Sequence, residues 1–156
     1  MKSVEILTLV RPIGLVLYFF LASQGAFYQV GFGKALFDIS PEGFIELRKA
    51  VDPRVRENLK AIYLSSLVIM VIWLALTIRS GGLFSYGSVL AAFLLLVADL
   101  VLALKASEPV NELINSGLLN TRKGYINARA EWMKYIFIRG NLVIVGFVIL
   151  LLGLVL

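Results

Sequence analysis

Four long apolar stretches, separated by charged segments, dominate the sequence. Residues 12–33, 61–78, 80–104 and 140–156 carry no charged side chain except Asp99 in the third stretch. A helix needs roughly 17–25 mostly apolar residues to cross a bilayer, and no stretch shows the alternation of a membrane β-barrel. The pattern therefore predicts an all-α integral membrane protein, a four-helix antiparallel bundle in which the whole chain 1–156 is a single transmembrane domain. We expect spans at 10–33, 60–79, 83–105 and 132–156.

The segments between the spans predict two further helices. Residues 41–60 mix apolar and charged side chains at helical spacing, which is typical of an amphipathic helix that lies on the membrane surface or folds over the bundle. Pro53 is expected to break this helix, because proline lacks the backbone donor that a helix interior needs. A short helix should begin at Ser107-Glu108-Pro109, with the serine as its cap. That helix should end near Ser116-Gly117.

Basic residues predict how the protein is oriented. They concentrate in the two long loops, between the first and second spans and between the third and fourth spans. Positively charged loops stay in the cytoplasm, so we expect both long loops to be cytoplasmic and both termini to lie outside. The loop residues behind this prediction are Lys34, Arg48, Lys49, Arg54, Arg56, Lys60, Lys105, Arg122, Lys123, Arg129 and Lys134.

Composition narrows the possible chemistry. The chain is 60% hydrophobic and 16% charged, and it contains no cysteine and no histidine. Disulfides and iron–sulfur clusters are therefore excluded, and haem, copper or zinc sites would lack their usual ligands. No glutamate pair lies within the spans, so no metal or other cofactor is expected. The net charge of +5 comes without a long basic tract, which argues against nucleic-acid binding.

Two ionisable residues lie inside the predicted spans, and they are the main candidates for a functional site. At 1.5 Å per residue, Asp99 lies roughly 24 Å along its span from Leu83, and Arg139 roughly 25 Å back from Leu156. In antiparallel neighbouring helices these depths match, so a direct or water-mediated salt bridge is expected. Intramembrane charges cost about 2.5 kcal/mol or more each and need a partner or a water-filled cavity. The carboxylate of Asp99 could be structural, a proton relay or a ligand anchor.

Three polar or aromatic residues near the cytoplasmic ends of the spans are further candidates. Asn111 and Asn115 share one face of the short helix that follows the third span. Trp132 and Tyr135 lie at the start of the last span, where aromatic rings commonly anchor a protein at the lipid headgroups. We expect Asn111 and Trp132 to line the mouth of any pocket that contains Asp99 and Arg139, and Tyr135 is a further ligand-binding candidate.

Several short motifs are similar to those of a known family. They are Gln24-Gly25-Ala26-Phe27 in the first span, Glu108-Pro109-Val110-Asn111-Glu112-Leu113-Ile114 after the third, and Arg129-Ala130-Glu131-Trp132 leading to Arg139. In this layout the chain resembles the anthrone-oxygenase-like family of small four-helix membrane proteins, which are largely uncharacterised. The resemblance implies a cytoplasmic-side cluster of Asn111, Trp132 and Arg139, with Arg129 nearby, and a pocket for a flat hydrophobic molecule. Family members often carry a histidine where Ile136 stands, so the resemblance does not imply oxidation.

Three functions compete at this stage. The first is binding or modification of a lipophilic small molecule, such as a quinone or a polycyclic phenol, in a polar pocket within the bundle. The second is a non-catalytic accessory subunit of a larger membrane complex, and the third is a small proton-coupled transporter. The expected partners are membrane lipid, such a lipophilic molecule, and further copies of the chain or a larger complex. Whether the protein is an enzyme stays open, since no independent redox or nucleophilic group is evident.

Overall fold

The computed structural model describes residues 3–80 and 82–155, and within them the chain is helical apart from short connections. Two of the helical segments, η1 and η2, are single π-helical turns, in which the hydrogen-bonded turn is one residue wider than in an α-helix. The elements in chain order are α1 (Ser3–Phe27), η1 (Tyr28–Phe32), α2 (Gly33–Asp38), α3 (Pro41–Ser80), α4 (Leu83–Leu102), η2 (Ala103–Ser107), α5 (Glu108–Asn115) and α6 (Arg122–Val155).

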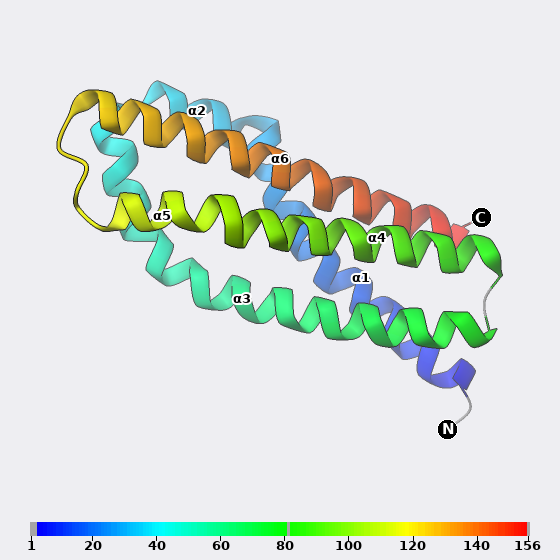
Figure 1. Cartoon of the computed structure of the whole chain (residues 1–156). Coiled ribbons are helices and arrows are strands. Elements are labelled where there is room, and N and C mark those ends of the chain that lie inside the picture. Colours follow the sequence, from blue (N-terminus) through cyan, green and yellow to red (C-terminus); the bar gives the residue numbers. More distant parts are fainter. Residues whose placement is uncertain (1–2, 81, 156) are drawn as a thin grey trace.

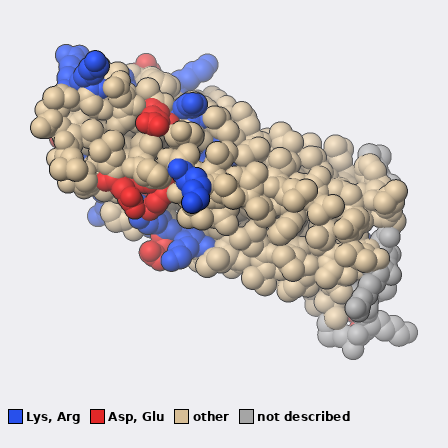
Figure 2. Space-filling model, in the orientation of Figure 1, with Lys and Arg blue, Asp and Glu red and all other residues tan. Residues whose placement is uncertain are grey.

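Four helical stretches of the described chain are long and apolar enough to cross a membrane. They cover 5–38, 41–78, 83–115 and 122–155. Figure 1 shows α3, α4 and α6 running most of the length of the molecule, with α1 crossing behind them. Lys, Arg, Asp and Glu gather over one end of the visible face, and the middle of that face shows none of these side chains (Figure 2). We call this the charged end; it comprises α2, residues 41–60 of α3, α5 and residues 122–134 of α6.

The main core fills the uncharged part of the bundle. Helix α6 packs against α4 and α1, and α3 packs against the same two helices. Trp73, Tyr18 and Leu96 are among the fully buried side chains at the centre. Helices α1 and α6 approach most closely at Gly25 and Gly140, where a Cβ added to Gly25 would lie 2.6 Å from the Gly140 Cα. Such close backbone contact is typical of membrane helices and requires glycine on both sides.

A second apolar core holds the charged end together. Phe44 from α3, Ile114 from α5 and Met133 from α6 are almost completely buried in it. The ring of Trp132 packs edge-on against Phe44, with ring centroids 5.5 Å apart. The charged end is therefore a packed part of the fold.

The predicted break at Pro53 is wrong. Helix α3 continues through Pro53 as one helix from Pro41 to Ser80, joining the amphipathic segment to the second apolar stretch. The carboxylate of Asp52 bonds to Arg48 at 3.0 Å and to Arg56 at 3.1 Å, one turn before and one turn after Pro53. These ion pairs lie on either side of the position where proline removes a backbone hydrogen bond. The predicted spans also begin or end inside longer helices, and residue 156 of the last span lies outside the described residues.

Candidate functional site

The two intramembrane candidates meet. The Nε–H group of Arg139 on α6 donates to the Oδ1 atom of Asp99 on α4 at 2.8 Å. The side chain of Asp99 is fully buried, and that of Arg139 is 15% exposed. The salt bridge predicted from the equal depth of these residues is thus direct, and it lies inside the bundle.

Two residues that the sequence did not single out as site residues complete this cluster. The hydroxyl of Tyr63 on α3 donates to Asp99 Oδ2 and accepts a 3.0 Å hydrogen bond from Nη2 of Arg139. The hydroxyl of Ser107 accepts a longer hydrogen bond, 3.4 Å, from Nη1 of Arg139. We call Tyr63, Asp99, Ser107 and Arg139 the ionic cluster. Both carboxylate oxygens and all three guanidinium nitrogens have partners within it.

The π-helical turn η2 explains how Ser107 reaches the ionic cluster. Asp99 and Ser107 are eight residues apart, and at about 100° per residue a regular α-helix would separate them by about 80° around its axis. The one extra residue of η2 rotates Ser107 back by about 100°, which brings it within about 20° of Asp99.

The predicted serine cap is wrong, because Ser107 has helical backbone angles and makes no capping hydrogen bond. The predicted end of α5 is confirmed at Asn115, followed by Gly117 with φ of 73°.

A small hollow adjoins the ionic cluster, and Gln24 is one of the residues that line it. The hollow has a cavity of about 10 Å³, about the minimum that holds one water molecule. Gln24 on α1 lines it, is half-buried, and forms no side-chain hydrogen bond within the described part of the chain. Gln24 was not a predicted site residue, although it is the first residue of the motif Gln24-Gly25-Ala26-Phe27. The full lining consists of Leu21, Gln24, Gly25, Tyr63, Asp99, Ile136, Arg139, Gly140 and Val143.

Asn111 and Trp132 form a different cluster at the charged end. The indole Nε1–H of Trp132 donates to Asn111 Oδ1 at 2.9 Å. Nη2 of Arg48 donates to the same oxygen at 3.3 Å, and the Arg48 guanidinium lies over the Trp132 ring, 4.4 Å from its centroid. The predicted proximity of Asn111 and Trp132 is correct, but neither residue lines the hollow beside Asp99 and Arg139.

Ion pairs extend this second cluster and join α3 to α5. Asn115 donates its side-chain amide to Asp52 Oδ2 at 2.9 Å, so Asn111 and Asn115 face α3 together, as their spacing predicted. Arg56 bonds to Glu108 at 2.7 Å. Because Glu108, the first residue of α5, directly follows Ser107, the last residue of η2, the junction of these two elements contacts both clusters.

Two further residues lie apart from both clusters. Tyr135 is half-buried against the core of the charged end, and its ring centroid lies 5.6 Å from Nζ of Lys134. Arg129 donates to the backbone carbonyl oxygens of Phe37 and Ile39, which fixes the end of α2 against α6. Among residues 3–80 and 82–155, no group of three His, Cys, Asp or Glu side chains is placed to hold a metal ion.

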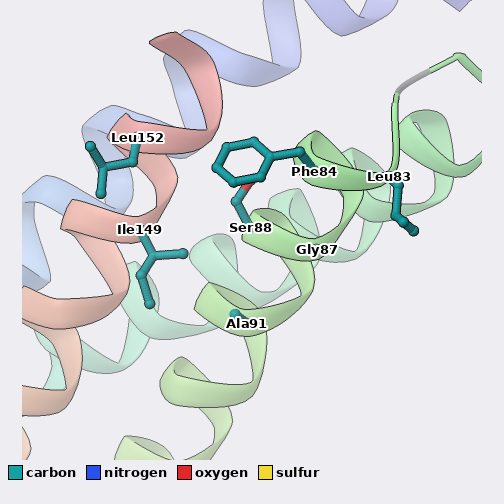
Figure 3. A pocket seen from close by; sticks show the side chains of 7 residues that line it. All are labelled: Leu83, Phe84, Gly87, Ser88, Ala91, Ile149 and Leu152. Carbon is teal, nitrogen blue, oxygen red and sulfur yellow. The ribbon is translucent and has the colours of Figure 1, made fainter. Parts of the chain in front are cut away.

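A larger hollow lies between α4 and α6, near the end of the bundle opposite the charged end. Its volume is about 640 Å³. Figure 3 shows Ile149 and Leu152 of α6 on one side and Phe84, Ser88 and Ala91 of α4 on the other. The hydroxyl of Ser88 already donates to the Ser85 carbonyl oxygen at 2.9 Å. Ser88 is the single polar side chain among the lining residues and its donor is already used, so the wall offers little to orient a ligand. The full lining consists of Leu83, Phe84, Gly87, Ser88, Ala91, Ile149 and Leu152.

Comparison of the chain with protein-family models, with curated proteins and with solved structures found no match. The resemblance to the anthrone-oxygenase-like family therefore stays a prediction, and the site must be interpreted from its own geometry.

Proposed function

We propose that this chain is an integral membrane protein whose helices form an antiparallel four-span bundle, and that it binds the oxygen-bearing end of a lipophilic small molecule in the hollow between Gln24 and Arg139. The observation that carries the proposal is the unpaired amide of Gln24 beside a buried ion pair. The proposed activity is binding, and no reaction is assigned to it.

The amide of Gln24 needs a partner. In the hydrocarbon region no bulk water reaches a polar group, and an unpaired amide costs about 1–3 kcal/mol on protein scales. The other polar side chains around the hollow are Tyr63, Asp99 and Arg139, and these already bond to one another. A water molecule or a polar group of a ligand would satisfy Gln24, and the adjoining cavity has room for one such group.

The ionic cluster also favours a binding role. A buried ion pair is weak evidence for stability, because apolar side chains of similar volume often stabilise a core as well or better. Charged residues within membrane spans usually mark a functional site. A bundle that needed only stability would be served by apolar side chains at the positions of Asp99 and Arg139.

The size of the cavity limits what can enter. A volume of about 10 Å³ holds a single oxygen-bearing group and excludes an aromatic ring. Among the lining residues, Gln24, Ile136 and Arg139 keep partial exposure, so the hollow opens on their side. The apolar body of the ligand would lie along the opening, against Ile136.

For the orientation we propose that the charged end faces the cytoplasm, as the positive-inside rule requires. The chain has no cysteine, so single cysteines can be introduced and labelled one at a time. In intact cells a membrane-impermeant maleimide should label Gly82→Cys, whereas Lys49→Cys should react only after permeabilisation. Both positions are exposed, so the difference would come from the membrane. The reverse pattern would overturn this orientation.

The binding proposal is tested by native mass spectrometry of protein extracted from its own membrane in mild detergent. We expect a retained small-molecule mass on the wild type that is lost in Gln24→Leu. Gln29→Leu is the matched control: Gln29 lies on η1, bonds to Asn141 at 3.0 Å and does not line the hollow. Retention of the same mass by Gln24→Leu, or its absence from the wild type, would refute the proposal.

A further inference from the structure

The polar atoms around the hollow differ in how much hydrogen-bonding capacity they have left. A guanidinium has five N–H donors, and Arg139 uses three of them, one from each nitrogen, on Asp99, Tyr63 and Ser107. Two donors of Arg139 therefore stay unused. The side-chain amide of Gln24 adds two more donors and one acceptor.

The hydrogen-bond acceptors of the ionic cluster are less available to a ligand in the hollow than the unused donors of Arg139. The side chain of Asp99 is 0% exposed, whereas that of Arg139 is 15% exposed. Both Asp99 oxygens already accept hydrogen bonds. The hydroxyl proton of Tyr63 is committed to Asp99. A ligand entering the hollow thus meets mainly unused N–H donors, and the amide oxygen of Gln24 is the accessible free acceptor.

The charge of the ionic cluster also selects among ligands. The positive charge of Arg139 is balanced by the carboxylate of Asp99, and Tyr63 is neutral because it donates its proton in a hydrogen bond. The cluster therefore has no net charge to offer. A carboxylate in the hollow would be an anion without a balancing positive charge, which is costly in a low-dielectric site. The N–H donors of an ammonium would face the N–H donors of Arg139 and Gln24, which is also costly there.

We propose that the hollow selects a neutral carbonyl-type oxygen, which accepts hydrogen bonds from Arg139 and Gln24, over a carboxylate or an ammonium on the same hydrocarbon chain. This inference rests on the proposed binding function and names the ligand chemistry of that site. A carbonyl oxygen has two lone pairs and so can accept from both side chains at once.

Three probes of equal chain length test the selection: 2-undecanone, undecanoate and undecylamine. Each is added at the same concentration to protein stripped of small molecules, and the bound fraction is measured by native mass spectrometry. We expect the ketone to be retained most. Losing one neutral hydrogen bond in Gln24→Leu should lower its retention about threefold to tenfold, and Gln29→Leu should leave it unchanged. With a ¹³C-labelled carbonyl, the infrared C=O stretch should move to lower frequency on wild type and less so on Gln24→Leu.

The possible outcomes separate the two proposals. If undecanoate or undecylamine is retained best, and its retention falls in Gln24→Leu, the hollow is a binding site but the selection for a neutral carbonyl is wrong. If the ketone is retained equally by wild type and Gln24→Leu, the probe binds elsewhere and this inference fails. If the wild type retains none of the three probes, the proposed function fails and the inference fails with it.

Discussion

Replacing Asp99 by asparagine removes the negative charge at the centre of the bundle and leaves Arg139 in place. The side chain of Asp99 is fully buried, and its Oδ1 atom lies 2.8 Å from Nε of Arg139. Removing one partner of a buried pair costs about 3–5 kcal/mol, because the remaining charge stays buried without compensation. We therefore expect Asp99→Asn to lower the free energy of unfolding by about that amount. Asp38→Asn is the matched control, because Asp38 is exposed and forms no ion pair within the described chain.

The double variant Asp99→Asn/Arg139→Gln separates the loss of a contact from the burial of an unpaired charge. Neutral side chains replace both charges, so the double variant should lose less stability than Asp99→Asn alone. Unfolding in mixed detergent micelles, followed by circular dichroism, measures all the variants under one condition. Equal stability of Asp99→Asn and wild type, or losses that simply add in the double variant, would show that the pair is not coupled as the geometry requires.

Three other substitutions test the packing of the bundle. Gly25→Ala would place a methyl group 2.6 Å from the Gly140 Cα atom and should cost about 1–3 kcal/mol of stability in the same unfolding assay. Gly87→Ala meets no atom within 4 Å and should be neutral or stabilising by up to about 1 kcal/mol, so equal effects of the two would contradict the close approach. Trp132→Phe removes the 2.9 Å hydrogen bond to Asn111 and should cost about 1 kcal/mol or more; an unchanged melting curve would argue against that bond.

The sequence predicted four long apolar helices, and the described chain has four that are long and apolar enough to cross a membrane. An apolar stretch of about 20 residues can satisfy its own backbone hydrogen bonds only as a helix, unless it pairs in a closed barrel. The sequence also predicted the contact of Asp99 with Arg139, since two charges at equal depth in neighbouring spans need a partner. It missed Ser107, because regular helical spacing turns that residue away from Asp99, and a π-helical turn has no evident sequence signal. It also predicted a break at Pro53 from the local cost of proline in a helix, whereas α3 continues through that residue.

The division of the candidate residues into two clusters also needed the structure. The resemblance to the anthrone-oxygenase-like family implied one cytoplasmic-side cluster of Asn111, Trp132 and Arg139. In the fold, Asn111 bonds to Trp132 and Arg48 at the charged end, whereas Arg139 bonds within the ionic cluster. Small rotations of each helix decide which neighbour a polar side chain meets, and sequence spacing does not fix those rotations.

The most direct test of the central claim is a crystal structure of the protein purified with the small molecules of its own membrane, at a resolution that shows ordered water. The proposed function predicts non-protein density with one polar group within hydrogen-bond distance of both Gln24 and Arg139, continuing as an apolar body past Ile136. A single isolated water peak beside Gln24, with no continuing density in the hollow, would contradict it and leave the ionic cluster with a structural role.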